Sequence, residues 1–341
     1  MMKTYKAMQV TRPGVLELVD RETPQPGPGK VLVQVEACGI CGADAGTIEA
    51  RQPGFPFPRV PGHEVVGRIA AIGVGTPSFW KIGQRVGIGR LGGHCNECMQ
   101  CRRGQFQLCM NQPVVGSSQD GGYAEMMIVR STGLVSIPDE LDSMEAAPIL
   151  CAGIATFNAL KKSGAEAGDL VAIQGIGGLG HLAVQYASRM GFKVAAIGRG
   201  DDITDDVLAL GAHVYVDSSK VDPAARLGAM GGAMAILTTI TDSSAASALM
   251  PGLAPQGKLI VLGVGKDPLT ISPGQLVIGE RVVMGTITGT PIESEKALDF
   301  SALTGIRPLI ETMPLAQAYE AYKRVMSGEV KFRMVLTIDP N

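Results

Sequence analysis

Hydrophobic and polar positions alternate along the first half of the chain in short runs that are rich in β-branched residues and bounded by glycine and proline. This pattern is typical of β-strands with one buried face. It predicts strands over Val31–Ala37, Glu64–Ile72 and Tyr123–Val129. The first 150 or so residues are therefore expected to form a β-rich domain.

From about Thr156 the pattern changes to strands that alternate with helices. An apolar strand over Leu170–Gln174 is followed by an amphipathic helix over His181–Met190 and a second strand over Lys193–Ile197. Such alternation is typical of a parallel, doubly wound sheet. Further strands are predicted over Val214–Val216, Ala235–Thr238 and Lys258–Leu262.

The helical pattern returns from about Pro291, and Arg333–Thr337 has the composition of a last strand that rejoins the first domain. The predicted fold class is α/β with two domains. Residues 1–152, completed by 291–341, form the β-rich domain, and residues 153–290 form the doubly wound domain.

Composition excludes several classes of function. The 341 residues are enough for two hydrophobic cores, and 45% apolar and 18% charged residues are ordinary for a soluble globular protein. A net charge of −2 gives no electrostatic reason to expect nucleic acid or an anionic membrane as a partner. No run of about eighteen uninterrupted apolar residues occurs, and Met1–Thr11 lacks the apolar core of a secretory signal. We expect a cytoplasmic protein with reduced thiols.

Four of the seven cysteines lie within fifteen residues: Cys95, Cys98, Cys101 and Cys109. Thiolates at this spacing on a turning loop can close around one tetrahedral Zn²⁺, and a closed Cys₄ site holds structure and does no chemistry. An iron–sulfur cluster is the main alternative, although the seven-residue gap and the lack of a Cys-Pro pair favour zinc. Two disulfides are a weaker alternative, because nothing else in the chain indicates secretion.

A glycine-rich turn separates the predicted strand over 170–174 from the predicted helix over 181–190. It reads G-I-G-G-L-G, with Gly175, Gly177, Gly178, Leu179 and Gly180 as its key residues. In a strand–turn–helix setting these glycines let the backbone approach a pyrophosphate, whose charge is met by the helix N-terminus. The turn therefore predicts a dinucleotide-binding site.

The end of the next strand bears on the choice of coenzyme. An NAD site usually places Asp or Glu there to accept hydrogen bonds from the ribose, but this chain has Gly198 followed by Arg199. The missing carboxylate removes repulsion against a 2′-phosphate, and Arg199 can pair with that group, which favours NADP(H) over NAD(H). Asp201 and Asp202 argue the other way, and a solvated surface arginine is the alternative for Arg199.

A second group of metal-binding side chains is spread along the chain. His63 and Glu64 begin a predicted strand, Cys41 precedes a turn that contains Asp44, and Cys151 lies at the junction of the two domains. Two cysteines and one histidine are a known ligand set for a catalytic zinc with an open position. Taken singly, each residue is more often structural than a ligand.

Together, these motifs resemble the zinc-containing medium-chain alcohol dehydrogenases. The matching segments span nearly the whole chain and read C-G-I-C-G-A-D, P-G-H-E, the four-cysteine loop, A-P-I-L-C-A-G and I-Q-G-I-G-G-L-G. The segment S-A-L-T-G-I-R-P-L-I-E-T is similar to the bacterial branch of that family. The resemblance implies a GroES-like catalytic domain followed by a Rossmann domain, and a homodimer or homotetramer. The run Val282–Ile287 is then a candidate edge strand at a subunit interface, or an edge covered by a loop.

The resemblance also implies roles for single residues. Cys41, His63 and Cys151 would ligate the catalytic zinc, with Glu64 as a carboxylate that can approach the metal and Asp44 orienting His63. Cys38 would be left as a buried thiol. Zinc would polarise a carbonyl or stabilise an alkoxide, and hydride would pass between that carbon and the nicotinamide.

The chain departs from the family pattern at the proton relay and the substrate pocket. Ala43 stands where a Ser or Thr hydroxyl usually carries the proton, and Gly46 stands where many members have His. Arg90 replaces a Trp that usually lines the substrate pocket, and it either charges that pocket or turns to solvent. Ala155 replaces a Thr that supports the nicotinamide, and the next residue, Thr156, is the candidate to compensate. A last candidate for coenzyme contact is Thr238.

Three functions follow. The leading one is an NADP(H)-preferring zinc enzyme that interconverts alcohols with aldehydes or ketones. The second reduces imines or other C=N bonds, because a protonated acceptor needs less from a relay that Ala43 lacks. The third is a non-catalytic coenzyme-binding protein with structural zinc, against which the joint presence of Cys41, His63 and Cys151 argues.

Overall fold

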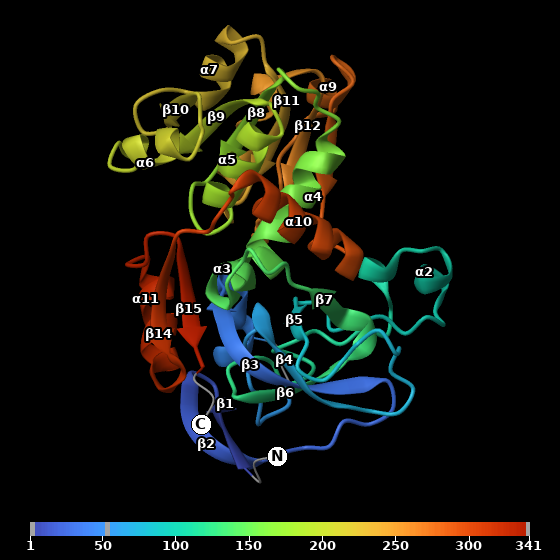
Figure 1. Ribbon diagram of the computed structural model, residues 1–341. Helices are drawn as coiled ribbons and strands as arrows, with labels where there is room; N and C mark the ends of the chain where they lie inside the picture. Colours follow the sequence, from blue (N-terminus) through green and yellow to red (C-terminus); the bar gives the residue numbers. More distant parts are fainter. Residues whose placement is uncertain (1–3, 52–54, 339–341) are drawn as a thin grey trace. The chain divides into compact units, whose positions relative to one another are not determined.

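The computed structural model describes residues 4–51 and 55–338, and these divide into two units (Figure 1). Of the described residues, unit 1 combines 4–51 and 55–151 with 289–338, and unit 2 comprises 152–288. Each unit has its own sheet and its own apolar core.

Unit 1 is built around a mainly antiparallel sheet. Its strands run in the order β14-β15-β3-β4-β5-β7, with β6 paired to β3 and with β1 and β2 as a separate hairpin. Their bounds are β1 Thr4–Arg12, β2 Val15–Glu22, β3 Lys30–Ile40, β4 Val65–Ile72, β5 Arg85–Ile88, β6 Met126–Arg130, β7 Leu134–Ser136, β14 Ile310–Pro314 and β15 Arg333–Thr337. Figure 1 shows β15, near the red end of the chain, beside β3, near its blue end, and the two pair antiparallel.

The helices of unit 1 are mostly short, so the expectation of a β-rich domain is confirmed. They are α1 Ala45–Ile48, α2 Met99–Arg102, α3 Ser143–Pro148, α10 Pro291–Thr304 and α11 Ala318–Ser327. The core between helices and sheet includes Leu32, Val86 and Tyr123, which are all buried.

Unit 2 is a parallel sheet of the predicted kind. Its strands run in the order β10-β9-β8-β11-β12-β13, which is the 3-2-1-4-5-6 order of a Rossmann fold. The strands are β8 Leu170–Gln174, β9 Lys193–Gly198, β10 Val214–Asp217, β11 Ala233–Thr238, β12 Leu253–Val261 and β13 Val282–Gly285. The helices are α4 Ile154–Ser163, α5 Gly180–Arg189, α6 Thr204–Ala209, α7 Pro223–Ala229, α8 Ser243–Ser247 and α9 Pro273–Val277. Helix α5 packs on β8 and β9, while α4 packs on β11 and β12.

The predicted strand over Tyr123–Val129 is wrong at its start. Strand β6 begins at Met126, because the three residues before it bond to other segments. The amide of Tyr123 donates to the carbonyl of Pro61, and the amide of Glu125 donates to that of Lys6. Tertiary contacts thus override a continuous β-pattern.

The helical stretch Ser143–Ser163 is long and apolar enough to cross a membrane by length and composition alone. Its most apolar window has a mean hydropathy of 1.2, and 83% of that window is buried within the protein. Burial of this extent is typical of a helix in the core of a globular protein.

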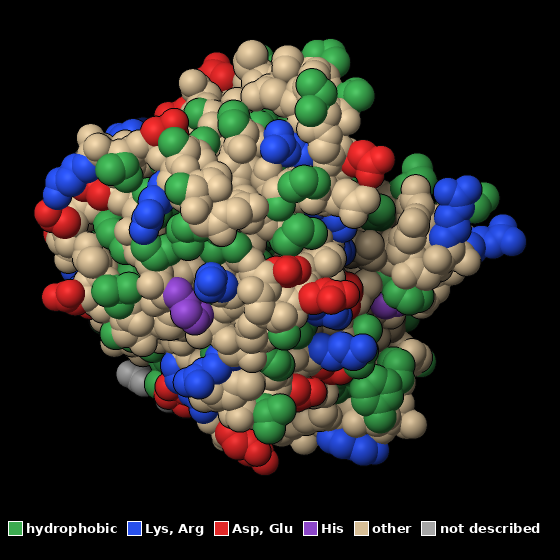
Figure 2. Space-filling view, turned by 90° about the horizontal axis from the view of Figure 1, so that it is seen from above, with side chains coloured by type: hydrophobic (Ala, Val, Ile, Leu, Met, Phe, Trp, Pro, Cys, Tyr) green, Lys and Arg blue, Asp and Glu red, His purple; other side chains and the backbone are tan. Residues whose placement is uncertain are grey.

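On the face of the molecule shown in Figure 2, acidic and basic side chains are interspersed.

Candidate active site and metal sites

The turn after β3 presents Cys41. The Cys41 thiol accepts from the amide of Ala43 at 3.5 Å, and the Cys41 amide donates to Oδ2 of Asp44 at 2.9 Å. These bonds close a reciprocal cap on the short 3₁₀ turn Gly42–Asp44. The local sequence C-G-A-D therefore fixes both the Cys41 sulfur and the Asp44 carboxylate.

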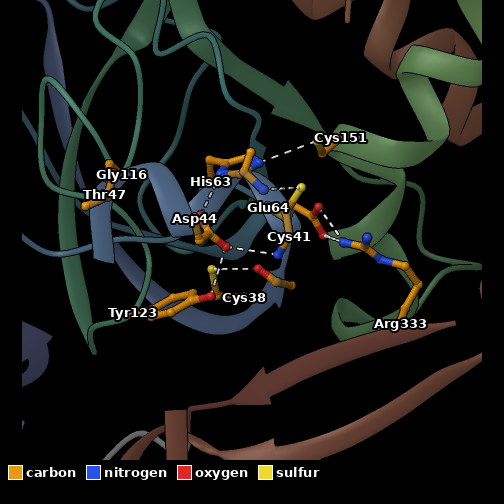
Figure 3. A network of polar contacts seen from close by, with 12 residues as sticks. Cys38, Cys41, Asp44, Thr47, His63, Glu64, Gly116, Tyr123, Cys151 and Arg333 are labelled. Atoms are coloured by element: carbon orange, nitrogen blue, oxygen red, sulfur yellow. Dashed lines mark hydrogen bonds and ion pairs between the residues drawn. The ribbon is translucent and has the colours of Figure 1, made fainter. Parts of the chain in front are cut away.

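His63 comes from the segment just before β4 and is buried. Its Nδ1 lies 2.9 Å from Oδ1 of Asp44. A carboxylate at Nδ1 keeps the proton on that nitrogen and leaves Nε2 with its lone pair free, which is the tautomer a metal ligand needs. Nε2 points at Cys151, whose sulfur lies 3.5 Å away (Figure 3).

Cys151 lies in a π-helical turn, Ile149–Gly153, between α3 and α4. Such turns are rare and are often found at functional sites, because the extra residue redirects the side chains. One donor atom each of Cys41, His63, Glu64 and Cys151 lies within 4.8 Å of the others. The structure thus brings together residues that are up to 110 positions apart in the sequence.

This donor set fits a zinc ion. Zinc–sulfur and zinc–nitrogen bonds of about 2.3 and 2.0 Å place the ligand atoms of a tetrahedron roughly 3.5–3.8 Å apart. The separation of 3.5 Å between Cys151 and His63 falls in that range. Zinc also prefers nitrogen and sulfur over all-oxygen sites.

The protein gives the donors of this cluster different proton affinities. A hydrogen bond from Cys151, against the opposing effect of burial, holds the pKa of Cys41 well below its usual value, while the same bond and burial raise the pKa of Cys151. Burial lowers the pKa of His63, but the Asp44 carboxylate outweighs it and raises that pKa to about 10. Without a metal the imidazole therefore holds a proton on each nitrogen at neutral pH, and a metal that binds Nε2 has to displace the proton there. Without a metal, Cys41 therefore holds the more acidic of the two sulfurs, and Cys151 has to lose its proton when a metal binds.

Glu64 is completely buried and is paired with Arg333 of β15 (Figure 3). Both carboxylate oxygens accept from the same guanidinium nitrogen, Nη2. Burial raises the pKa of Glu64 to about 7, and the charge of Arg333 opposes that rise. Arg333 was not predicted as a site residue from the sequence, although a lone arginine in the apolar run R-M-V-L-T is a signal that points to it.

The four-cysteine loop forms a second cluster. Its sulfurs are 3.6 Å apart for Cys98–Cys101 and Cys95–Cys109, and 3.9 Å apart for Cys95–Cys101 and Cys98–Cys109. All four are free thiols, so the two-disulfide alternative is wrong. A single tetrahedral zinc predicts sulfur–sulfur distances of about 3.8 Å. Backbone amides of Glu97 and Cys98 lower the pKa of Cys95 to about 6, which favours its metal-binding form.

The glycine turn of unit 2 has the backbone that a dinucleotide needs. Gly175 has φ of +86°, and a side chain on Gly180 would meet the carbonyl of Gly175 at 1.9 Å. Beside Gly177 no atom lies within 4 Å, so its backbone is open to an approaching group. Gly178 and Leu179 complete the turn before α5, whose N-terminus supplies amide donors.

Two buried polar atoms without partners lie next to this turn. Thr238, at the end of β11, is paired in register with Gln174, at the end of β8. Thr238 Oγ1 and Gln174 Oε1 are both buried and make no hydrogen bond. Orphaned polar atoms at the carboxyl edge of a parallel sheet fit a site that a coenzyme completes. Gln174 was missed by sequence analysis.

The strand end that carries Gly198 is held by β10. The Tyr215 hydroxyl donates to the carbonyl of Gly200 at 2.6 Å, and a Cβ at position 198 would lie 2.4 Å from that hydroxyl oxygen. The side chain of Arg199 is exposed. Lys220 pairs with Asp201 at 2.6 Å, which offsets part of the negative charge that argued against a phosphate.

The remaining predicted residues are placed as follows. Thr156 is buried and donates to the carbonyls of Ala152 and Gly153 in the π-helical turn that precedes α4. Ala43 is exposed, and a side chain on Gly46 would meet no atom within 4 Å. The usual relay positions are therefore open.

Comparison with known proteins agrees with this architecture. The family description "Alcohol dehydrogenase GroES-like domain" matches residues 27–139, and "Zinc-binding dehydrogenase" matches residues 178–302. Alcohol dehydrogenase notN from Aspergillus sp. (strain MF297-2) is 41% identical over 338 residues, which cover 99% of both chains.

Two solved structures have the same fold. CAD from Helicobacter pylori, complexed with NADP(H), has a TM-score of 0.86 and 27% identity over 99% of both chains. Acetophenone reductase from Geotrichum candidum, in complex with NAD, has a TM-score of 0.88 and 28% identity over 99% of this chain and 98% of the other.

A GroES-like half, a Rossmann half and a buried cluster of sulfur and imidazole donors define a zinc-type nicotinamide oxidoreductase. The chain belongs to the zinc-containing medium-chain alcohol dehydrogenase family. The predictions of family, fold class and enzymatic nature are thereby confirmed, and a non-catalytic binding protein is excluded.

Proposed function

We propose that the protein is an NADP(H)-preferring alcohol dehydrogenase that works as an aldehyde or ketone reductase and holds two zinc ions per chain. The observation that carries the proposal is the convergence of Cys41, His63, Glu64 and Cys151 donor atoms within 4.8 Å. Zinc held there supplies Lewis-acid polarisation of a substrate oxygen, and a bound nicotinamide supplies or accepts hydride. The four cysteines of the loop would hold the second, structural zinc.

The protein's own residues prepare this site. Asp44 keeps the proton of His63 on Nδ1, so that Nε2 faces the other donors. Arg333 balances the charge of Glu64 inside the protein, which keeps that carboxylate from being an unpaired buried charge. Cys41, His63 and Cys151 would hold the zinc, and Glu64, paired with Arg333, would be a carboxylate close enough to approach it.

The proposed coenzyme preference depends on residues at the end of β9. The relatives include complexes with NADP(H) and with NAD, so they do not discriminate. In this chain, Tyr215 occupies the space that an acidic side chain at position 198 would need. Arg199 is exposed and adjacent, and a guanidinium binds phosphate well.

Ala43 and Gly46 support a second candidate on the same scaffold, the reduction of imines or other C=N bonds. A ketone needs a proton at oxygen when hydride arrives, and neither residue can supply one. An iminium acceptor already carries its proton. If the enzyme reduces aldehydes or ketones, the proton would be carried either by a water in the open space beside Gly46 or by the Glu64 carboxyl group.

The test is a side-by-side rate assay with NADPH, using a panel of aldehydes and ketones and a panel of cyclic imines, with total zinc measured on the same sample. About two zinc ions per chain with fast carbonyl reduction supports the leading proposal. Two zinc ions with turnover of imines alone favours the second. Faster turnover with limiting NADH than with equal NADPH contradicts the coenzyme preference.

We also propose that unit 1 is the catalytic domain, unit 2 the coenzyme domain, and that the enzyme is a cytoplasmic homodimer or homotetramer. Strand β13 is the edge of the parallel sheet, and Val282 on it is 42% exposed. An exposed apolar edge strand is a ready surface for pairing with a second copy.

A further inference from the structure

The Asp44 carboxylate accepts three hydrogen bonds in the interior of unit 1 (Figure 3). His63 Nδ1 lies 2.9 Å from Oδ1, and the Cys41 amide lies 2.9 Å from Oδ2. The third donor is the hydroxyl of Tyr123, also 2.9 Å from Oδ2. Two of these donors belong to proposed ligands, and Tyr123 does not.

Tyr123 is locked to the segment that carries His63. The Tyr123 amide donates to the carbonyl of Pro61 at 3.0 Å, and the Gly122 amide donates to the carbonyl of Gly62 at 3.0 Å. Gly62 has φ of +95°, and a Cβ there would lie 2.3 Å from the Tyr123 ring. The glycine before His63 is therefore required by the tyrosine that packs on it.

The leftover thiol of Cys38 completes this packing. A Cβ on Gly62 would lie 2.8 Å from its sulfur, and a Cβ on Gly122 would lie 3.0 Å from it. Cys38 and Tyr123 are both completely buried. The Tyr123 ring is packed against Gly62 and Cys38, and this packing directs its hydroxyl toward Asp44.

The bond to Tyr123 limits how Asp44 can turn. Each oxygen of a carboxylate can accept more than one bond, and rotation about the side chain exchanges the two oxygens. Without the tyrosine, Oδ2 would keep only the bond from the Cys41 amide. Asp44 would then hold the imidazole ring of His63 in a less defined orientation.

We propose that Tyr123 is a positioning residue that acts through Asp44 to hold His63 in ligand geometry, so that it slows the loss of the catalytic zinc. This inference rests on the proposed zinc site of Cys41, His63 and Cys151. Mutation of a residue that is hydrogen-bonded to a metal ligand commonly changes metal affinity by about 10–100-fold. Asp44 is such a residue, and Tyr123 is hydrogen-bonded to Asp44 rather than to a ligand side chain.

The experiment measures zinc release from the purified holoenzyme into a colorimetric chelator. Two release phases are expected, and the phase that is missing in Cys41→Ser is assigned to the catalytic site. In Tyr123→Phe that phase should be about 10-fold faster, while the phase of the four-cysteine loop keeps its rate.

Tyr322→Phe is the matched control. Tyr322 is also buried in unit 1, and its hydroxyl donates to Glu49 at 2.7 Å, a carboxylate outside both metal clusters. This variant loses the same kind of bond, so its catalytic-zinc release should match that of the wild type. Equal acceleration in both variants would mean general loosening of the unit and would overturn the inference.

A second comparison uses Asp44→Asn as background. If Tyr123 acts through Asp44, adding Tyr123→Phe to Asp44→Asn changes zinc release little, so the two effects do not multiply. Independent, multiplicative effects would contradict the relay, and so would an unchanged rate in Tyr123→Phe. A wild-type enzyme with no release phase that depends on Cys41 would instead overturn the proposed zinc site itself.

Discussion

Arg333 and Glu64 form a buried ion pair between the last strand of the chain and the start of β4, 269 residues apart in sequence. Their side chains are 5% and 0% exposed. Charges this deeply buried are tolerated only as a pair, because each would otherwise lose its hydration without compensation. The pair ties β15 to the candidate metal cluster, of which Glu64 is a member.

Replacing Arg333 by Met should destabilise unit 1 by about 3–5 kcal/mol, because Glu64 would remain as an unpaired buried carboxylate. Denaturant unfolding measures this loss. Arg68→Met is the control, because Arg68 is half exposed and its pair with Glu36 is expected to contribute only about 0–1 kcal/mol. Similar losses of unfolding free energy in the two variants would contradict the prediction that breaking the buried Arg333–Glu64 pair costs more than breaking an exposed pair.

Restoring the proton relay should raise alcohol oxidation. Ala43→Thr combined with Gly46→His supplies the missing hydroxyl and imidazole, and Gly46 has open space for a side chain. A positioned acid–base group is commonly worth about 10²–10⁴ in rate, so an increase of at least about 10-fold in kcat is expected. Ala43→Thr with Gly46→Ala is the control. No increase in the double variant would mean that another group already carries the proton.

The coenzyme preference should respond to Tyr215 as well as to Gly198. Gly198→Asp alone should weaken both coenzymes, since the new side chain collides with the Tyr215 hydroxyl. Adding Tyr215→Ala makes room, and the kcat/KM ratio should then shift toward NADH by roughly 1–3 kcal/mol, as for one strong hydrogen bond. Tyr215→Ala alone is the control. A full switch with Gly198→Asp alone would show that the tyrosine moves aside freely.

Arg199→Ala should raise the Kd for NADPH by an amount equivalent to roughly 1–3 kcal/mol and leave NADH binding nearly unchanged, if Arg199 pairs with the 2′-phosphate. Fluorescence titration with each coenzyme measures both constants. Equal weakening of the two coenzymes would place Arg199 outside the phosphate site.

The four-cysteine loop should lose its metal when one ligand is removed. In Cys98→Ser the zinc content should fall from about two to about one per chain, and the loop should become sensitive to protease, since a tetrahedral site needs all four donors. Met99→Ser changes an exposed side chain on the same loop that belongs to neither cluster, and this variant should keep about two zinc ions. Iron in place of zinc at the loop would contradict the assignment.

The four-cysteine loop and the glycine turn could be predicted from the sequence for a physical reason. Cys95 to Cys109 lie on one loop, and Gly175 to Gly180 on one turn, so their spacing alone constrains their geometry. Strands β8 and β9 of unit 2 were likewise predicted well, because each is an apolar run that is buried on both faces of a parallel sheet. Strand ends were less certain, as β6 shows, where contacts of Tyr123 and Glu125 with distant segments end the pairing.

By itself, the sequence determined the two-domain α/β organisation, both groups of candidate metal donors and the glycine turn. Tertiary structure alone decided which groups surround these motifs: Arg333 beside Glu64, Tyr123 on Asp44, and Tyr215 against Gly198. Each of these pairs joins separate elements, and side-chain identity does not reveal which buried polar groups will meet. That choice is made when the chain packs, because every buried charge or hydroxyl must find a partner in the folded interior.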